Sequence, residues 1–307
     1  MKIFVLAPAE DWICDRLVNE WYENFSDYST KNIQQADIIW LLAGWCWNHI
    51  PLDVLKNKKV IVSEHHFVPE KFSSEKYQNF MLRDSFVDAY HVPNEKTENF
   101  LRQITKKPIY NISYWLNDKL WKPSDKIAAR KKLGIDENNF CIGSFQRDTE
   151  GFDLITPKLE KGPDIFCDVV GALNKHIDNI HVILGGWRRQ YVQHRLEENG
   201  IKYSLFEKSD LSKIQFMYAA SDLYVVSSRY EGGPQAIIEA AAMKIPILST
   251  DVGIASKVLS KNCITDFKSF KMPNEEVNYN YDSVQKLSIS RIGKEYLKMM
   301  NEVINEK

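Results

Sequence analysis

Two glutamates, Glu231 and Glu239, are separated by seven residues in the segment Glu231-Gly-Gly-Pro-Gln-Ala-Ile-Ile-Glu239. Carboxylates accept hydrogen bonds, so they suit the vicinal hydroxyls of a sugar or a ribose. The glycines between them, Gly232 and Gly233, leave backbone amides open to close approach by a ligand. Pro234 is expected at the first helical position, where its missing N–H costs nothing. The amides and the helix dipole together favour an anion, such as a diphosphate, at this helix start.

The spacing alone is equally compatible with two ordinary surface glutamates on a solvated helix. The flanking sequence separates the two interpretations. An apolar run, Leu223–Ser227, comes before the pair, and a helical segment of small residues, Gln235–Ala242, follows it. Small residues on a helix indicate close packing against a sheet. This context favours a ligand site.

The elements that must position this pair come from an alternation of short apolar runs and helical segments. Such alternation is typical of βαβ units on a parallel sheet, and continuous apolar runs suit strands that are covered on both faces. The expected strands are Lys2–Pro8, Asp37–Ala43, Lys59–His65, Tyr110–Trp115, Phe140–Phe145, His181–Leu184, Lys202–Phe206, Leu223–Ser227 and Pro246–Thr250. The expected helices are Trp12–Asn24, Glu95–Gln103, Lys126–Leu133, Pro163–His176, Arg188–Asn199, Leu211–Ala220, Pro234–Met243, Ile254–Leu259 and Ser290–Glu306.

The pattern predicts an α/β protein of two Rossmann-like domains facing a cleft. A length of 307 residues allows two domains at about 150 residues each. We expect residues 1–116 to form the first domain, 117–138 a linker and 139–283 the second domain. The last helix, within 284–307, is expected to pack back on the first domain. Ligands of open α/β sheets bind beyond the carboxyl ends of the strands, so the informative residues should follow strands.

Composition narrows the classes of function. The net charge of −1 argues against binding a nucleic-acid backbone as the main activity. Five dispersed cysteines without a Cys-x-x-Cys pair argue for a reducing compartment and against a disulfide framework or a zinc site. No run of about 18 apolar residues predicts a membrane span, and the apolar start Ile3–Ala9 is too short for a secretory signal. We therefore expect a cytoplasmic protein, with peripheral contact at the inner membrane face compatible with this composition.

Four segments resemble, in order, landmarks of the retaining glycosyltransferases of the GT-B fold, family four, in the glycogen-synthase-like superfamily. The segments are Ile142-Gly143-Ser144-Phe-Gln-Arg147 with Lys161-Gly162, Ile183-Leu-Gly185-Gly186, Ala219 to Glu231, and Glu239 to Gly253. The resemblance extends well over residues 85 to 305 and weakly over the first 80. It implies transfer of a sugar from a nucleoside-diphosphate sugar, UDP- or GDP-linked, to a glycan, lipid or protein-linked acceptor, with retention of configuration. Polysaccharide biosynthesis is the implied setting.

The resemblance also implies roles for individual residues. Glu231 would contact hydroxyls of the donor sugar and Glu239 the ribose. Arg147 and Lys161 would neutralise the leaving diphosphate, where preorganised cations are most useful. The implied donor-binding set is Gly143, Ser144, Gly185, Gly186, Gly232, Gly233, Pro234, Gln235, Ala236 and Glu239. The chain has no Asp-x-Asp motif, and the resemblance implies neither a metal ion nor a cofactor.

Two segments depart from the family pattern. An insert, Asp148–Glu160, separates Arg147 from Lys161, whereas the family has a short loop. The family's glycine pair after the first strand is replaced by Ala7-Pro-Ala-Glu-Asp-Trp12.

Histidines and aromatic residues follow the expected strands of the first domain. His65 comes at a strand end, where the family places a histidine facing the donor sugar, and its titration near neutrality allows a general-base role. A surface or capping role is the alternative, and the choice between His65 and His66 is open. Trp12, Arg16, Trp45 and His66 are the expected acceptor contacts, since aromatic faces stack on sugars. Burial in the domain core is the alternative for the tryptophans, including Trp40 and Trp47.

Other readings of the same fold stay open. A nicotinamide dehydrogenase needs Gly-x-Gly-x-x-Gly after a strand, which the chain lacks. A nucleotide-sugar epimerase or hydrolase, or a non-catalytic nucleotide-sugar-binding protein, fits the same residues.

Arg188 and Arg189 are expected at a helix start, either solvated or facing an anion.

Overall fold

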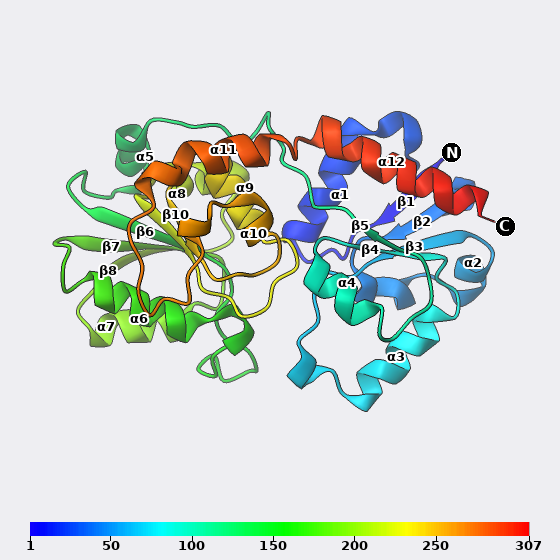
Figure 1. The fold of residues 1–307 in the computed structure, drawn as a ribbon, viewed down its shortest axis with the longest axis horizontal. Coiled ribbons are helices and arrows are strands. Elements are labelled where there is room, and N and C mark those ends of the chain that lie inside the picture. Colours follow the sequence, from blue (N-terminus) through cyan, green and yellow to red (C-terminus); the bar gives the residue numbers. More distant parts are fainter. Residues whose placement is uncertain (307) are drawn as a thin grey trace. The chain divides into compact units, whose positions relative to one another are not determined.

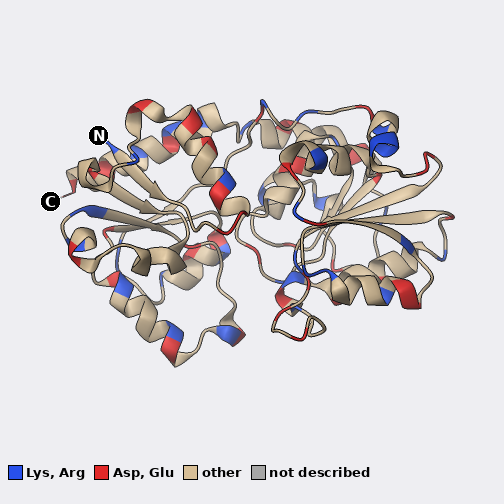
Figure 2. Ribbon diagram, turned by 180° about the vertical axis from the view of Figure 1, so that it is seen from behind, with Lys and Arg blue, Asp and Glu red and all other residues tan. Residues whose placement is uncertain are grey.

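The computed structural model describes residues 1–306, which fall into two α/β units (Figure 1). Unit 1 comprises Met1–Asn117 with the C-terminal stretch from Leu287, and unit 2 comprises Asp118–Lys286. Each unit has its own five-stranded sheet, and within the described residues the neighbouring strands of both sheets pair in parallel. Basic and acidic residues are interspersed over both units, in keeping with the net charge of −1 (Figure 2). The α/β class and the two parallel sheets predicted from the sequence are confirmed.

Unit 1 is built on the strand order β1-β2-β3-β4-β5. The strands are β1 (Ile3–Leu6), β2 (Ile38–Leu41), β3 (Lys59–Ser63), β4 (Ala89–Val92) and β5 (Ile109–Asn111). The helices are α1 (Ile13–Asn24), α2 (Leu52–Lys56), α3 (Ser74–Asp84), α4 (Glu95–Leu101) and α12 (Ile289–Asn305), with 3₁₀ turns η1 (Ser26–Tyr28), η2 (Ile33–Gln35), η3 (Gly44–His49) and η4 (Pro69–Lys71). Ser29 also forms a parallel bridge with Ile3 of β1, on the edge that β2 leaves unpaired. After β1, the chain first passes along one side of that strand, at Ser29, and then forms β2 on its other side. Ligands of α/β sheets bind where the strand order reverses in this way.

The C-terminal helix α12 packs on unit 1, as predicted. Tyr296 of α12 places its hydroxyl 2.9 Å from His91 Nε2 in β4. Gly293 lies so close to Phe25 that an added Cβ would lie 1.9 Å from the ring. Because a side chain at Gly293 would clash, this glycine sets the close approach of the helix.

Strand β4 was not predicted, because its residues Ala-Tyr-His-Val include a histidine with no exposed surface. His91 Nδ1 accepts from Ser63 Oγ at 2.8 Å, and Nε2 donates to the Ile112 carbonyl at 2.7 Å. Burial lowers the pKa of His91 to about 3, so the ring is neutral and both nitrogens are satisfied. The strand expected at Tyr110–Trp115 is shorter than predicted and ends at Asn111.

Unit 2 has the strand order β10-β9-β6-β7-β8, which reverses between β6 and β9. The strands are β6 (Phe140–Phe145), β7 (Ile180–Gly185), β8 (Lys202–Phe206), β9 (Leu223–Val226) and β10 (Ile247–Ser249). The helices are α5 (Lys126–Leu133), α6 (Pro163–Leu173), α7 (Gln190–Glu198), α8 (Leu211–Ala220), α9 (Gln235–Ala242), α10 (Ala255–Val258) and α11 (Val277–Gln285), with 3₁₀ turns η5 (Leu159–Lys161), η6 (Lys261–Cys263) and η7 (Asn274–Glu276).

Two segments of unit 2 differ from the sequence expectation. The expected linker, 117–138, falls in unit 2 from Asp118 onward, where α5 packs on α8 and Arg130 Nε donates to the Ala220 carbonyl at 3.1 Å. Helix α11 was not predicted because Asn280, fully buried, interrupts its apolar pattern. That side chain accepts a hydrogen bond from the Ser260 backbone at 2.8 Å, which explains how an amide is tolerated there.

Candidate functional site

The predicted donor residues gather at the carboxyl edge of the unit 2 sheet. β6 pairs with β7 on one side and β9 on the other, so the connections after β6 and β9 start at the point where strand order reverses. Arg147 follows β6, and Glu231 follows β9. Ligands of open α/β sheets bind at such a reversal. The fold therefore places these residues where a ligand is expected.

Lys161 and Glu231 form an ion pair although they are 70 positions apart in the chain. Lys161 Nζ lies 2.7 Å from Glu231 Oε1, and Ser228 Oγ donates to the same oxygen at 3.0 Å. The two charged side chains are only 19% and 14% exposed, so solvent screens the contact less than at an open surface. A cation and a carboxylate are thereby fixed at one point, where an anion can bind Lys161 and a hydroxyl can bind Glu231.

Gly162 holds Lys161 against the loop that follows β9. It has a φ of 61°, and an added Cβ would lie 1.9 Å from the Ser227 carbonyl oxygen. Ser227 Oγ donates to the Gly162 carbonyl at 2.7 Å, and Gln146 Nε2 donates to the Lys161 carbonyl at 3.1 Å. Only glycine permits both the left-handed backbone and this approach. Lys161 is therefore positioned by backbone packing as well as by its ion pair.

Glu239 is the buried member of the carboxylate pair, at 5% exposure. Tyr218 donates its hydroxyl to Glu239 Oε2 at 2.8 Å. The Tyr218 ring packs against Phe145 and Tyr224, with centroids 4.7 and 5.3 Å away. This aromatic cluster orients the carboxylate. No sequence pattern pointed to Tyr218, which occupies an ordinary position in helix α8.

Helix α9 begins at Gln235, so Pro234 is its N-cap rather than its first residue. This corrects the prediction, and the positive end of the helix dipole still lies at the Gly-Gly-Pro turn. The turn packs against Gly253, where an added Cβ would lie 2.3 Å from the Gly232 carbonyl oxygen. Gly232 and Gln235 are buried, and Gly233, Pro234 and Ala236 are half-buried.

Three other predicted donor residues have packing roles in the structure. An added Cβ on Gly143 would lie 2.8 Å from Ser221 Oγ, and one on Gly185 would lie 2.6 Å from Met217 Cε. Ser144 is buried, and its Oγ accepts from Arg189 Nη2 at 3.1 Å. Donor contact by these three residues stays a prediction.

Arg189 and Asp148 form a fully buried ion pair that the sequence did not reveal. Arg189 Nε lies 2.8 Å from Asp148 Oδ2, and neither side chain is exposed. Arg189 Nη1 also donates to the carbonyls of Ser144 and Gly185. Burial raises the pKa of Asp148, and the guanidinium opposes that rise. Both alternatives for Arg189, solvated and anion-facing, were wrong, since it ties the loops after β6 and β7 together.

Arg147 and Lys161, expected to act on one diphosphate, have different partners. The Arg147 guanidinium carbon lies 5.6 Å from the centroid of the Trp187 ring, and that of Arg188 lies at the same distance. Trp187 is 43% exposed. Gly186 before it has a φ of 94° and forms the turn that presents this tryptophan.

In unit 1, His65 lies just beyond β3 as predicted, but both its ring nitrogens are engaged. Nε2 donates to the Leu42 carbonyl at 2.8 Å, and Tyr114 donates its hydroxyl to Nδ1 at 2.8 Å. A general base needs a free nitrogen lone pair within reach of the substrate. The proposed base role therefore requires Tyr114 to move. His66, beside it, is half-buried.

The loop after β1 has its backbone amides occupied by a side chain of the protein. Asp15 accepts hydrogen bonds from the amides of Ala9 and Glu10 at 2.8 Å each. Ala9 and Asp11 have φ values of 58° and 55°, a left-handed conformation that costs about 1–3 kcal/mol per non-glycine residue. Asp15 thus replaces an external anion at the place where the family has its glycine pair.

The expected acceptor residues lie on both sides of the reversal in the unit 1 sheet. Trp12 follows β1 and is 43% exposed; Trp45 follows β2 and is 53% exposed. Trp45 Nε1 donates to Glu10 Oε1 at 3.1 Å. Arg16 is mostly buried, with Nε 3.9 Å from Glu20 Oε1. Trp40, in contrast, is a core residue with no exposed surface.

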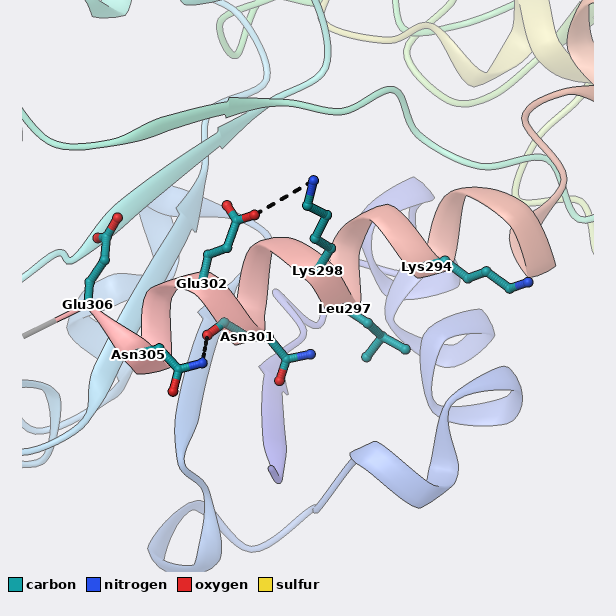
Figure 3. A pocket seen from close by; sticks show the side chains of 7 residues that line it. All are labelled: Lys294, Leu297, Lys298, Asn301, Glu302, Asn305 and Glu306. Carbon is teal, nitrogen blue, oxygen red and sulfur yellow. Dashed lines mark hydrogen bonds and ion pairs between the residues drawn. The ribbon is translucent and has the colours of Figure 1, made fainter.

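Three further findings concern the rest of the described chain. A shallow hollow is lined by one face of α12, where Lys298 pairs with Glu302 at 3.8 Å and Asn305 donates to the Asn301 carbonyl (Figure 3); none of the predicted site residues lines it. Among residues 1–306, no group of three or more His, Cys, Asp or Glu side chains is arranged to hold a metal ion. No helix in that range is long and apolar enough to cross a bilayer.

The chain is similar to known proteins over parts of its length. Residues 154–269 match the family model described as glycosyl transferases group 1. The lipopolysaccharide core biosynthesis mannosyltransferase LpsB of Rhizobium meliloti is 28% identical over 145 residues, 45% of this chain and 39% of the relative. A glycogen synthase of Fervidobacterium nodosum is 26% identical over 203 residues, 64% of this chain and 39% of the relative. The chain thus spans about two fifths of the length of these curated relatives.

Solved structures share the fold over the whole chain. Anabaena Alr3699/HepE in complex with UDP-glucose is 15% identical, with a TM-score of 0.77 over 98% of this chain and 99% of that one. A sucrose-phosphate synthase from Thermosynechococcus elongatus is 17% identical, with a TM-score of 0.66 over 94% of this chain and 77% of that one. The predicted GT-B fold is confirmed, and so is the predicted resemblance to GT-B glycosyltransferases.

Proposed function

We propose that this chain, which has the GT-B fold and resembles glycosyl transferases group 1 over residues 154–269, transfers a glycosyl group from a nucleoside-diphosphate sugar to a glycan, lipid or protein-linked acceptor. The observation that carries the proposal is the Lys161–Glu231 pair at the reversal of the unit 2 sheet, with Nζ 2.7 Å from Oε1. It supplies a cation for a phosphate and a carboxylate for sugar hydroxyls at one point. The names of the relatives, a mannosyltransferase and a glycogen synthase, support sugar transfer.

Donor binding follows from the residues around this pair. The diphosphate lies at the start of α9, where the helix dipole favours an anion, and Lys161 and Arg147 balance the charge that develops on the leaving group. Glu231 binds hydroxyls of the sugar. Glu239, oriented by Tyr218, binds the ribose. A UDP-linked donor is favoured because the HepE structures are complexes with UDP, UDP-glucose or UDP and glucose.

The reaction proceeds with retention and without a metal ion. The bond from the anomeric carbon to the diphosphate oxygen breaks, and a bond to the acceptor hydroxyl forms on the same face of the sugar. The acceptor proton passes to the departing diphosphate oxygen, so no base from the protein is required. His65, the candidate base in unit 1, has both ring nitrogens engaged. Trp12 and Trp45 of unit 1 bind the acceptor by stacking on its sugar rings.

A thermal-shift screen with UDP, GDP, ADP and their sugars tests the donor half of the proposal. A ligand at about 100 times its Kd stabilises the protein by about 2.7 kcal/mol. Lack of a shift with every nucleotide sugar would contradict the proposal. Donor turnover that needs an added acceptor separates a transferase from an epimerase or hydrolase. Binding of a nucleotide sugar without any turnover would indicate that the chain is a non-catalytic binding protein.

A further inference from the structure

The insert 148–160 forms a short hairpin that displays apolar side chains to solvent. Thr149 and Pro157 form an antiparallel bridge at its base. At its tip, Phe152 is fully exposed, Ile155 is 73% exposed and Leu154 is 40% exposed. Figure 1 shows the segment as a green loop that projects from the α/β body of unit 2 near α6. Contiguous exposed apolar side chains of this kind mark interaction surfaces.

Contacts with the rest of unit 2 fix the conformation of the hairpin, and so fix the exposed positions of its apolar side chains. At the base, Asp148 belongs to the fully buried ion pair with Arg189. Halfway along, Arg188 Nη2 donates to the Gly151 carbonyl. At the tip, Asp153 Oδ1 accepts from the amides of Ile155 and Thr156 at 3.0 and 3.1 Å. Two backbone amides of the tip are thereby satisfied internally, which lowers the cost of moving its backbone out of water.

Cationic and aromatic side chains lie beside the hairpin. Trp187 is 43% exposed, and the guanidinium groups of Arg147 and Arg188 lie 5.6 Å from its ring. Tryptophan and arginine are typical of the headgroup level of a bilayer, and arginine is attracted to anionic lipids. The hairpin also carries the acidic residues Asp148, Glu150, Asp153 and Glu160. Asp148 pairs with Arg189 and Glu160 with Lys158, and the Asp153 carboxylate is turned onto the amides of its own turn.

We propose that the hairpin 148–160 is a membrane-docking surface that inserts its apolar tip into a bilayer containing anionic lipids. Phe152, Leu154 and Ile155 enter the boundary between headgroups and acyl chains, while Trp187 and Arg188 contact the headgroups. A bilayer is favoured over a protein partner because a projecting tip with internally hydrogen-bonded amides suits an apolar medium, and the flanking guanidinium of Arg188 matches anionic headgroups. The proposal does not rest on sugar transfer, since it concerns binding alone.

Vesicle co-sedimentation of the full chain tests the proposal directly. The probes are vesicles of phosphatidylcholine alone and vesicles of equal parts phosphatidylcholine and phosphatidylglycerol. We expect binding to the anionic vesicles, and a drop of about tenfold or more in partitioning for the double variant Phe152→Ser, Ile155→Ser, given the apolar area removed. Ile127→Ser is the matched control, because Ile127 is 63% exposed on α5 of the same unit; it should bind as the wild type does.

A depth measurement separates insertion from mere adsorption. Phe152→Trp should be quenched by vesicles whose acyl chains carry bromine, whereas Ile127→Trp should not. All variants change exposed side chains, so their melting temperatures should match that of the wild type. Absence of wild-type binding to anionic vesicles would overturn the proposal. Equal binding by the double variant would overturn it too, because another surface would then hold the chain on the vesicle.

Discussion

The buried imidazole of His91 makes the stability of unit 1 depend on pH. Its pKa is lowered from 6.5 to about 3, chiefly by burial. The unfolded chain therefore binds a proton on His91 below about pH 6.5 that the folded chain does not bind. The stability from the neutral ring is complete above the unfolded pKa and is lost progressively as the pH falls from about 6.5 toward 3.

The size of the effect follows from the two pKa values. At about pH 5, the pH lies about 1.5 units below the pKa of His91 in the unfolded chain. Each unit corresponds to about 1.4 kcal/mol, so the free energy of unfolding falls by about 2 kcal/mol. Urea unfolding at about pH 7 and about pH 5 measures it. The near-UV circular dichroism of the buried tryptophans is the probe, because the ring centroids of Trp40 and His91 are 6.3 Å apart.

Substitution isolates this contribution from every other titrating group. His91→Gln cannot titrate, so it should lose about 2 kcal/mol less than the wild type between the two pH values. His194→Gln is the control, because His194 is 74% exposed in α7, and it should follow the wild type. If the wild type and His91→Gln lose stability in parallel, His91 is not a neutral buried group and the reasoning fails.

Three further substitutions test the sites described above. Asp148→Ala should destabilise the protein by about 3–5 kcal/mol in urea unfolding, because it leaves the Arg189 guanidinium buried without its counter-ion. Tyr218→Phe should raise the donor Kd by about three- to tenfold in calorimetric titration, since it removes one hydrogen bond to Glu239. Trp45→Ala should raise the acceptor KM in a transfer assay while donor hydrolysis stays nearly unchanged, because it removes a stacking surface from unit 1 only.

Matched variants control the first two of these measurements. Asp164→Ala breaks a more exposed ion pair with Arg229 and should cost less than about 1 kcal/mol; an equal cost for Asp148→Ala would refute its buried role. Tyr203→Phe removes an exposed tyrosine–glutamate hydrogen bond and should leave donor binding unchanged. For Trp45→Ala, equal loss of transfer and hydrolysis together with lower stability would indicate a core residue.

The alternation of apolar runs predicted most of the fold because buried strands and helices carry strong periodic signals. Where the core contains polar residues, the signal fails. Strand β4 depends on a neutral His91 and helix α11 on a buried Asn280, and each is tolerated only through tertiary hydrogen bonds. Such partners are distant in sequence, so periodicity cannot reveal them.

In the candidate site too, the sequence predicted the residues in local motifs but not the contacts between distant positions. Glu231 was singled out by its local motif and Lys161 by the family resemblance, and the structure brings them into contact. The aromatic support of Glu239 by Tyr218 and the buried pair of Arg189 with Asp148 escaped notice, because both join positions at least 21 apart. Charged residues at a helix start are usually solvated, so the sequence favoured an exposed Arg189. Only the geometry shows that it holds two loops.

Calorimetric titration of Glu231→Gln with the nucleotide sugar that gives the largest thermal shift tests the central claim most directly. The substitution removes a charged hydrogen-bond partner, worth about 1.5–3 kcal/mol, so the donor Kd should rise by about ten- to 150-fold. Glu137→Gln is the control, because Glu137 is exposed and precedes β6 at the amino edge of the same sheet, and it should bind like the wild type. Undiminished donor binding by Glu231→Gln would contradict the assignment of this site.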